Sequence, residues 1–582
     1  MKILGKLLIL CLVVSCSMTP PQKNDKYPDM HFESVITNAL VLMPDMTTQK
    51  STIFLSEGKI IHVEKENYKN SAMLEGLLST NNSIEVIDAQ DNFVMPGLID
   101  AHAHFIALGE SKANLDFLGT ESWDEIVEMV KNKATKTPKG QWIVGRGWHQ
   151  EKWKTLPEKL VEGFPVHDEL SQVAADHPVM LGHASGHGLI ANQKAMDLAG
   201  ITPQSQIPDG GVMLLKPDGK PSGIFQENAM QLIYTAIENS KKDLSTTEKE
   251  NLFMEYLRLA EAECLSQGIT TVHDAGIDWN TAQKFLKLAD DNELNVRLYA
   301  MMSDKMLQNT DKTQLKNHIE KTRNHPFFTN TAVKAFADGA LGSRGAWLLE
   351  DYSDMPGYRG ENVTPIENLK KSAQMSAELN LQLCIHAIGD RGNREVIDIF
   401  EEIYPNELGA KRWRIEHAQH LNPKDIERIA HLEILASMQT VHCTSDAPYV
   451  VRRLGEKRAE QGAYVWQSLL KKNVHLANGT DAPIEKINPF ENLYAAVTRK
   501  RIDTGLEFYP NQKLSRKKAL QMYTQDNAYA AFQENWKGKI AKGFAADIII
   551  LDKNLLECSD EEILDTKVLF TLVNGKVKYR SK

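Results

Sequence analysis

Eight short apolar runs, separated mostly by segments with helical periodicity, occupy the middle of the chain. Continuous apolar runs of this length are typical of buried parallel strands. A clear helical pattern covers residues 245–267, where Ser245 and Glu248 form a capping box and Gly268 follows the last apolar position. The pattern predicts an α/β fold, a (β/α)8 barrel over about 94–537. Its expected strands lie at 94–104, 269–276, 295–302, 331–339, 381–389, 412–420, 434–440 and 474–483.

The two ends of the barrel region carry a different pattern. Residues 31–93 alternate apolar and polar positions in short runs, and the same texture returns only in 538–582. We therefore expect a small β-sandwich formed from the N- and C-terminal segments together. The gap between the first two barrel strands, about 105–268, is too long for one crossover, so it predicts an inserted subdomain.

The first sixteen residues have the pattern of an export signal. Lys2 and Lys6 precede a short apolar run, 7–14, that ends at Cys16 in a sequence resembling a bacterial lipobox. This predicts a lipoprotein signal peptide (1–15), lipidation of Cys16 and a polar tether (16–30). The protein would then be lipid-anchored in the bacterial cell envelope, as a periplasmic or outer-membrane lipoprotein. The alternative is an ordinary signal peptide with an incidental cysteine.

Composition narrows the functional classes. The 582 residues are 42% hydrophobic and 25% charged, which are ordinary globular values, and the formal charge is −10. A nucleic-acid partner is therefore disfavoured. Six cysteines are too few for a disulfide scaffold, and we expect the later ones to be free thiols. The 18 histidines are more than a solvated surface needs.

The first histidine pair follows the first predicted barrel strand. His102 and His104 are two positions apart on a strand, so both side chains leave the same face. They lie at the carboxyl end of the strand, where barrel active sites are found. Two imidazoles on one face suit a metal ion, although a histidine pair in a loop is the plain alternative.

Four more ligand-type residues lie near the ends of other predicted strands. Any one of them has an ordinary explanation, a hydrogen-bonded core histidine or an ion-paired lysine. Their joint placement, one per strand and in chain order, favours a common site. They are Lys334, His386, His417 and Asp481.

With these motifs in place, the chain resembles the amidohydrolase superfamily, and more closely its YtcJ-like branch (amidohydrolase family 3), which includes N-substituted formamide deformylases. The resemblance covers nearly all of 31–580. It rests on PGLIDAHAH, GRGWHQEKW, SGHGLIANQKA, VKAFADGALGSR, HAIGDRGN, RIEHAQ and GTDAP.

The resemblance implies one or two divalent metal ions inside the barrel. One ion would be held by His102, His104 and Asp481, and a second by His386 and His417. Lys334 would bridge them as a carbamate. Zinc suits this imidazole-rich set. If Lys334 is instead an ammonium paired with an acid such as Asp338, the site is mononuclear.

The implied reaction is hydrolysis of a C–N bond in a small amide-like or formamide-like substrate. A metal-bound hydroxide would attack the carbonyl, with Asp481 as general base. Deamination, isomerisation or ester hydrolysis on the same centre is the alternative within enzymes. A non-catalytic, ligand-binding surface lipoprotein is the alternative of another class. Homo-oligomerisation stays open.

Several further residues are weaker candidates. Substrate contacts are expected from His187, Trp148 and Arg344, each with a purely structural alternative. His149 departs from the resemblance, because relatives often carry aspartate there. Supporting positions around the ligands or in their loops are His273, Asp390, Arg391 and His420.

Overall fold

The computed structural model describes residues 31–582 apart from 67–71, 73, 77, 79–82, 118–119, 151–152, 184–187, 209–210, 343 and 407. The predicted signal peptide, Cys16 and the predicted tether lie outside the described residues. Among the described residues, no helix combines the length and the apolar character that crossing a bilayer requires.

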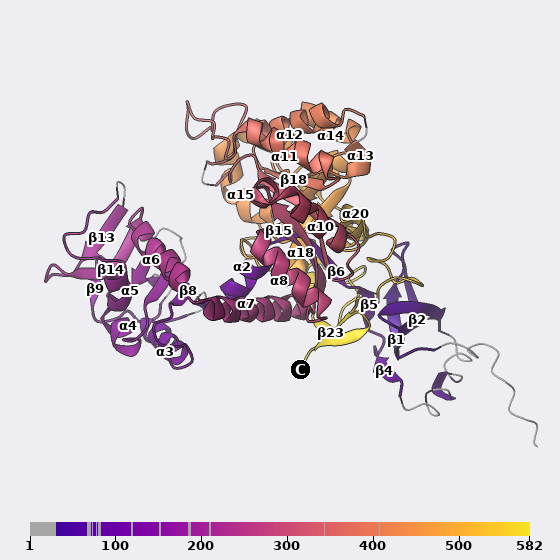
Figure 1. Ribbon diagram of the computed structural model, residues 1–582, viewed down its shortest axis with the longest axis horizontal. Helices are drawn as coiled ribbons and strands as arrows, with labels where there is room; N and C mark the ends of the chain where they lie inside the picture. Colours follow the sequence, from indigo (N-terminus) through magenta and orange to yellow (C-terminus); the bar gives the residue numbers. More distant parts are fainter. Residues whose placement is uncertain are drawn as a thin grey trace, which may run out of the picture.

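The central body is a parallel eight-stranded barrel (Figure 1). Neighbours along the sheet follow chain order from the first strand to the eighth. The prediction of a (β/α)8 barrel is confirmed, and the observed strands fall within the expected apolar runs to a few residues. They are β6 (Leu98–Ala103), β15 (Ile269–Ile277), β16 (Arg297–Ser303), β17 (Phe328–Phe336), β18 (Gln382–Ala387), β19 (Arg414–His417), β20 (Leu435–Met438) and β21 (Leu476–Asn478).

Helices surround this barrel and bury their apolar stripes against it. α7 (Thr246–Ser266) has the expected capping box between Ser245 and Glu248. The others are α2 (Phe105–Ala113), α8 (Trp279–Asp290), α9 (Asp304–Asn309), α10 (Lys312–Thr322), α11 (Ile366–Glu378), α12 (Asp390–Ile403), α13 (Leu408–Lys411), α14 (Pro423–His431), α15 (Thr440–Leu454), α16 (Glu456–Gly462), α17 (Trp466–Leu470), α18 (Pro489–Thr498), α19 (Arg516–Met522) and α20 (Gln525–Ala530).

The first apolar run, 94–104, is divided between two sheets at Pro96–Gly97. Its first part is β5 (Phe93–Pro96), which belongs to the terminal sheet, and its second part is β6 of the barrel. A Cβ atom on Gly97 would lie 2.4 Å from the side chain of Thr270, so only glycine allows this close approach. The chain therefore passes directly from the terminal sheet to the first ligand-bearing strand.

Both ends of the chain form one eight-stranded sheet. Its N-terminal members are β1 (Ser34–Leu42), β2 (Thr48–Ser56), β3 (Lys59–Lys65), β4 (Glu85–Asp88) and β5, and its C-terminal members are β22 (Ile548–Leu551), β23 (Val568–Val573) and β24 (Lys576–Arg580); the short α21 (Asp560–Leu564) lies between β22 and β23. β22 pairs antiparallel with β5. The buried Arg297 at the start of β16 donates to both carboxylate oxygens of Asp547, at 2.6 and 2.9 Å, and ties this sheet to the barrel.

The insertion has a sheet and two apolar cores of its own. In Figure 1 it stands beside the barrel, on the opposite side from the terminal sheet. The two helices that flank it in the chain, α2 and α7, pack against each other at the barrel. Its sheet contains β7 (Leu115–Asp116), β8 (Ile143–Trp148), β11 (Val179–His183), β12 (Gly188–Ala191), β13 (Gly211–Leu215) and β14 (Pro221–Glu227), with a small hairpin β9–β10 (Leu160–Val161, Phe164–Pro165) and helices α3 (Trp123–Ala134), α4 (Asp168–Val173), α5 (Gln193–Leu198) and α6 (Met230–Asp243).

The four cysteines in the described part of the chain are free. Cys264, Cys384 and Cys443 are buried and Cys558 is half-buried. Burial raises the pKa of the Cys443 thiol to about 12, so it stays protonated and packs as a small apolar group.

Candidate metal centre

The first cluster forms where the barrel closes between its first and last strands. His102 lies on β6, His104 follows it, and Asp481 follows β21. The backbone N–H of Asp481 donates to the carbonyl of His102 at 2.7 Å, and that of His104 donates to the carbonyl of Ala482 at 2.7 Å. These two hydrogen bonds hold the loop after β21 against the end of β6, which brings the three side chains together.

The donor atoms are spaced as ligands of one ion. Oδ1 of Asp481 is 3.2 Å from Nε2 of His104 and 3.6 Å from Nε2 of His102. Two ligands of a tetrahedral zinc ion, each about 2.0–2.1 Å from the metal, are about 3.3 Å apart. The cluster of His102, His104 and Asp481 therefore fits a divalent metal ion, as does its chemistry of two imidazoles and a carboxylate.

Lys334 reaches the same cluster from β17. Its Nζ lies 3.2 Å from Nε2 of His102, and the residue is 1% exposed. Burial lowers the pKa of Lys334, although Glu416 and Asp481 oppose the shift. A lysine that loses its proton more easily is a better nucleophile toward carbon dioxide.

Asp338 does not pair with this lysine. Its carboxylate accepts the backbone N–H groups of Trp347, Ile388 and Gly389 at 2.8–2.9 Å. It therefore braces the loops after β17 and β18, and no ion pair joins Lys334 to an acid among the described residues.

His386 and His417 lie side by side at the ends of β18 and β19. Their ring centroids are 4.4 Å apart. Burial and the nearby Lys334 lower the pKa of His386 to about 3, and burial also holds the pKa of His417 well below its usual range. Both rings are thus neutral, the form that binds metals. Nε2 of His386 is buried without a hydrogen-bond partner among the described residues, as expected of a ligand atom.

Neighbouring side chains orient the ligand rings. Nδ1 of His417 donates to Oε1 of Gln439 at 2.7 Å, and Nδ1 of His102 lies 2.5 Å from Oε2 of Glu416. Each contact directs the Nε2 lone pair of the ring into the centre. Neither Glu416 nor Gln439 was predicted from the sequence. Glu416 directly precedes the predicted ligand His417 in RIEHAQ, and Gln439 lies at the end of the seventh predicted strand.

The buried Glu416 lies next to His102 and Arg414, which stabilise its negative charge. Burial opposes its ionisation, but His102 and Arg414 lower the pKa of Glu416 to about 2. Nη1 of Arg414 is 3.8 Å from Oε1 of Glu416 and 3.3 Å from Nδ1 of His273. His273 is therefore linked to the centre through Arg414 and Glu416.

A fifth histidine near the centre is His442, which was not predicted from the sequence. Its Nε2 lies 3.7 Å from Oδ2 of Asp481, within a group that also includes His417. The amide Nε2 of Gln419 faces its Nδ1 at 2.9 Å. Because an amide N–H donates, the ring proton of His442 is on Nε2 and points toward Asp481. In the sequence, its position two residues after the seventh strand was the available signal.

The carboxylate of Asp481 lies next to three of these histidines, His102, His104 and His442. Burial would raise its pKa, but contact with the imidazoles of His104, His102 and His442 outweighs burial and holds the pKa well below the usual range. Its backbone φ is +58°, and that of His417 is +74°. Non-glycine residues in this region are uncommon and cluster at functional sites.

Two of the three expected substrate residues have structural partners, and the third lies outside the described part of the chain. Trp148 is buried in the core of the insertion, where its Nε1 donates to the carbonyl of Leu181 at 2.8 Å. Arg344 pairs with Asp354 at 3.0 Å. His187 lies outside the described residues. The structure thus gathers all six expected metal ligands, and it gives Trp148 and Arg344 structural partners.

The other weaker candidates act within the scaffold. Asp390 accepts the backbone N–H of Leu349 at 2.9 Å, and Arg391 pairs with Glu395. His149 packs against His183 in the insertion, with ring centroids 4.6 Å apart. His420 is buried against Tyr464.

Comparison with known proteins agrees with this site. The model of the amidohydrolase family matches residues 85–579. The chain is 32% identical over 556 residues to the protein LONG AFTER FAR-RED 3 of Arabidopsis thaliana, covering 92% of each chain. It is 29% identical over 537 residues to the putative amidohydrolase YtcJ of Bacillus subtilis, covering 90% of this chain and 97% of that protein.

Two further relatives bear on function and fold. An N-substituted formamide deformylase of Arthrobacter pascens is 25% identical over 502 residues, which are 85% of this chain and 90% of the relative. An uncharacterized metal-dependent hydrolase of Pyrococcus furiosus has a TM-score of 0.69 at 27% identity, covering 90% of this chain and all of that structure.

A (β/α)8 barrel with a histidine–carboxylate cluster at the carboxyl ends of its strands defines a metal-dependent hydrolase. The chain belongs to the amidohydrolase family, in its YtcJ-like branch.

Proposed function

We propose that the protein hydrolyses a C–N bond in a small amide-like or formamide-like substrate, with Asp481 as the general base. The observation that carries this proposal is the position of Asp481, whose two oxygens face His102 and His104 on one side and His442 on the other. A carboxylate with a depressed pKa stays ionised at neutral pH and is ready to accept a proton.

The residues that would hold the metal are those of the two clusters. His102, His104 and Asp481 would bind one ion, His386 and His417 a second, and Lys334, as a carbamate, would bridge them. Zinc fits this donor set. Such ions supply Lewis-acid polarisation of a carbonyl group and lower the pKa of water.

The chain's own groups account for the proton transfers. Asp481 takes the proton of the attacking water and delivers it to the departing amine nitrogen. Glu416 keeps His102 in the tautomer whose Nε2 faces the centre. The N–H of His442 lies beside Asp481 and would keep that carboxylate oriented during the transfer. The formamide class is supported by the name of the Arthrobacter relative.

The test replaces Asp481 with asparagine and assays a panel of N-formyl and N-acyl amines with metal-loaded protein. We expect the wild type to release the amine from at least one N-formyl or N-acyl compound, and the variant to lose that turnover while its circular dichroism spectrum is unchanged. Asp218→Asn, in an exposed turn of the insertion, is the matched control and keeps wild-type activity. Turnover by Asp481→Asn at the wild-type rate would rule out the general-base role.

We also propose that the mature protein is anchored in the cell envelope by lipid on Cys16. The basic, apolar and cysteine-terminated order of the first sixteen residues supports this. Expression in a bacterium and separation into detergent and aqueous phases should place the wild type with detergent. Cys16→Ser should move it to the aqueous phase, and a wild type already found there would refute the anchor.

A further inference from the structure

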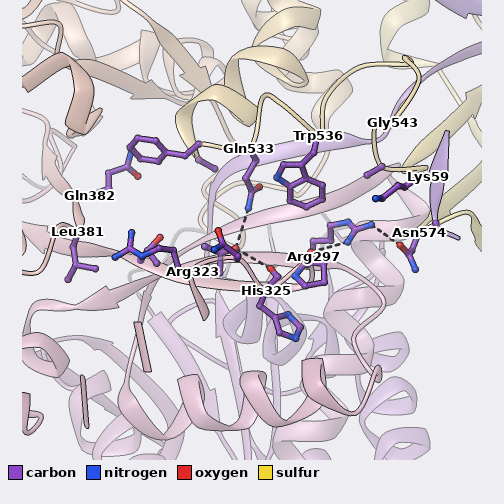
Figure 2. A pocket seen from close by; sticks show the side chains of 18 of the residues that line it. Lys59, Arg297, Arg323, His325, Leu381, Gln382, Gln533, Trp536, Gly543 and Asn574 are labelled. Atoms are coloured by element: carbon purple, nitrogen blue, oxygen red, sulfur yellow. Dashed lines mark hydrogen bonds between the residues drawn. The ribbon is translucent and has the colours of Figure 1, made fainter. Parts of the chain in front are cut away.

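A large cavity lies at the amino ends of the barrel strands, on the face opposite the metal centre. Its volume is about 680 Å³, within the range of small-molecule sites. On β17, Thr329 and Thr331 line it. Thr331 precedes Lys334 by three residues, which separates the cavity from the metal centre by about 10 Å along the strand. The terminal sheet closes one side through Lys59 at the start of β3 (Figure 2).

The rim of the cavity carries unbalanced positive charge. Lys59, Arg323 and Lys411 line it, and none of them forms an ion pair with a described residue. A fourth cation, Arg297, is neutralised by Asp547. Glu57 is the one carboxylate among the lining residues. The lining thus has a surplus of positive charge that an anionic ligand would balance.

A buried acceptor inside the cavity lacks a partner. Gln533 is 7% exposed, and its Oε1 has no hydrogen-bond partner among the described residues. Its Nε2 donates to Oγ1 of Thr329 at 3.3 Å, while that hydroxyl points its own proton at the carbonyl of His325, at 3.4 Å. The side-chain amide of Gln533 therefore cannot exchange the positions of its oxygen and nitrogen without losing one of these two hydrogen bonds. Figure 2 shows Gln533 reaching into the cavity, where its oxygen requires a donor.

Aromatic surface completes the lining. Phe532 is 45% exposed although it is a large apolar side chain, and the half-buried Trp536 lies on the same segment. Flat rings favour a ligand that is itself flat.

We propose that this cavity is a second ligand site, which takes a small aromatic carboxylate bearing a hydroxyl or N–H donor. The carboxylate would lie against Arg323 and Lys59, the ring against Phe532 or Trp536, and the donor against Oε1 of Gln533. This site is independent of the hydrolytic reaction proposed above.

The experiment is calorimetric titration of metal-loaded, full-length protein with 4-hydroxybenzoate. Two probes each lack one feature: benzoate has no donor and 4-hydroxybenzamide has no charge. We expect 4-hydroxybenzoate to bind at least tenfold more tightly than either. Equal binding of the three compounds, or no binding of 4-hydroxybenzoate, would overturn the proposal.

Variants locate the binding. Arg323→Ala should weaken 4-hydroxybenzoate binding about tenfold, whereas Arg359→Ala, an exposed arginine that does not line the cavity, should leave it unchanged. Gln533→Leu should abolish the advantage of 4-hydroxybenzoate over benzoate. If Arg323→Ala does not change binding and His386→Ala abolishes it, the ligand binds at the metal centre and the second site is refuted. Arg323 is exposed, so its replacement leaves folding intact.

Discussion

Glu416 and His102 are 314 positions apart in the chain, yet Oε2 of Glu416 lies 2.5 Å from Nδ1 of His102 and both side chains are fully buried. The contact fixes the orientation of the ring of His102, a predicted metal ligand. Arg414, which is also buried, forms an ion pair with the other oxygen of Glu416, Oε1, at 3.8 Å.

Glu416→Gln should keep the hydrogen bond to His102 and remove the charge. We expect metal affinity to fall about 10–100-fold, the usual effect of changing a group that holds a ligand. Competition with a chelator measures the affinity. Glu378→Gln on the exposed side of α11 is the control and should bind metal as the wild type does. Unchanged affinity in Glu416→Gln would contradict the role of the buried charge.

His442→Asn tests whether His442 orients Asp481 for proton transfer or binds the metal. Because the proton of His442 faces Asp481, we expect the kcat to fall about 100-fold, in the range of positioned proton-transfer groups, with metal content unchanged. His417→Asn, in contrast, should lose metal. Elemental analysis beside steady-state kinetics distinguishes the two, and loss of metal from His442→Asn would show that His442 is a ligand.

Gly479→Ala tests the closure of the barrel. An added Cβ would lie 2.4 Å from the backbone nitrogen of His102 and 2.6 Å from Oδ1 of Asp100. We expect a loss of about 1–3 kcal/mol in the free energy of unfolding, as for other overpacked sites, together with weaker metal binding. Gly182→Ala in β11 meets only ordinary contacts at 3.7 Å and serves as the control. Equal stability of the two variants would argue against the tight approach.

Lys537 makes stability depend on pH. Burial, with help from Arg297, lowers the pKa of Lys537 from 10.5 to about 7, although Asp547 opposes the shift. Between these values the unfolded chain holds one more proton than the folded one, so this residue makes stability rise with pH from about 7 to 10.5.

Lys537→Met should therefore be more stable than the wild type at pH 6, and the advantage should shrink by up to about 5 kcal/mol as the pH approaches 10.5. Urea unfolding of both proteins at pH 6, 8 and 10 measures the difference. The variant lacks the hydrogen bond from Lys537 to Thr271, 3.2 Å long, at every pH, because a charged and a neutral amine can both donate. Its loss therefore lowers the advantage without producing the change with pH. A difference that does not vary with pH would refute the buried lysine's role.

Local patterns were sufficient for the barrel because each strand is a continuous apolar run bounded by turns. They also led to the expectation that the six ligand-type residues lie close together, since the carboxyl ends of parallel strands meet at one end of the barrel. The division of 94–104 at Gly97 was not predicted, because the run is apolar on both sides of the kink and the reason for it, Thr270, is far along the chain.

Residues that act through distant partners escaped the sequence analysis. Glu416 lies between Ile415 and the predicted ligand His417, and it looks like one end of a surface ion pair until its neighbour His102 is known. His442 lies in the first turn of α15 and not at the end of a strand. For Trp148 the expectation of a substrate contact rested on its motif, and its packing against Trp153 within the insertion could not be inferred from spacing.

The shared terminal sheet has a consequence for the order of assembly. β5 leads directly into β6, which carries His102, and β5 receives its second neighbour only from β22. On the ribosome, residues 548–551 emerge after all the barrel strands, β6 to β21, have been made. β5, which leads into the first strand of the metal centre, therefore acquires its second neighbour only after the barrel strands have been made, and a polypeptide cut short before β22 would leave β5 with an open edge.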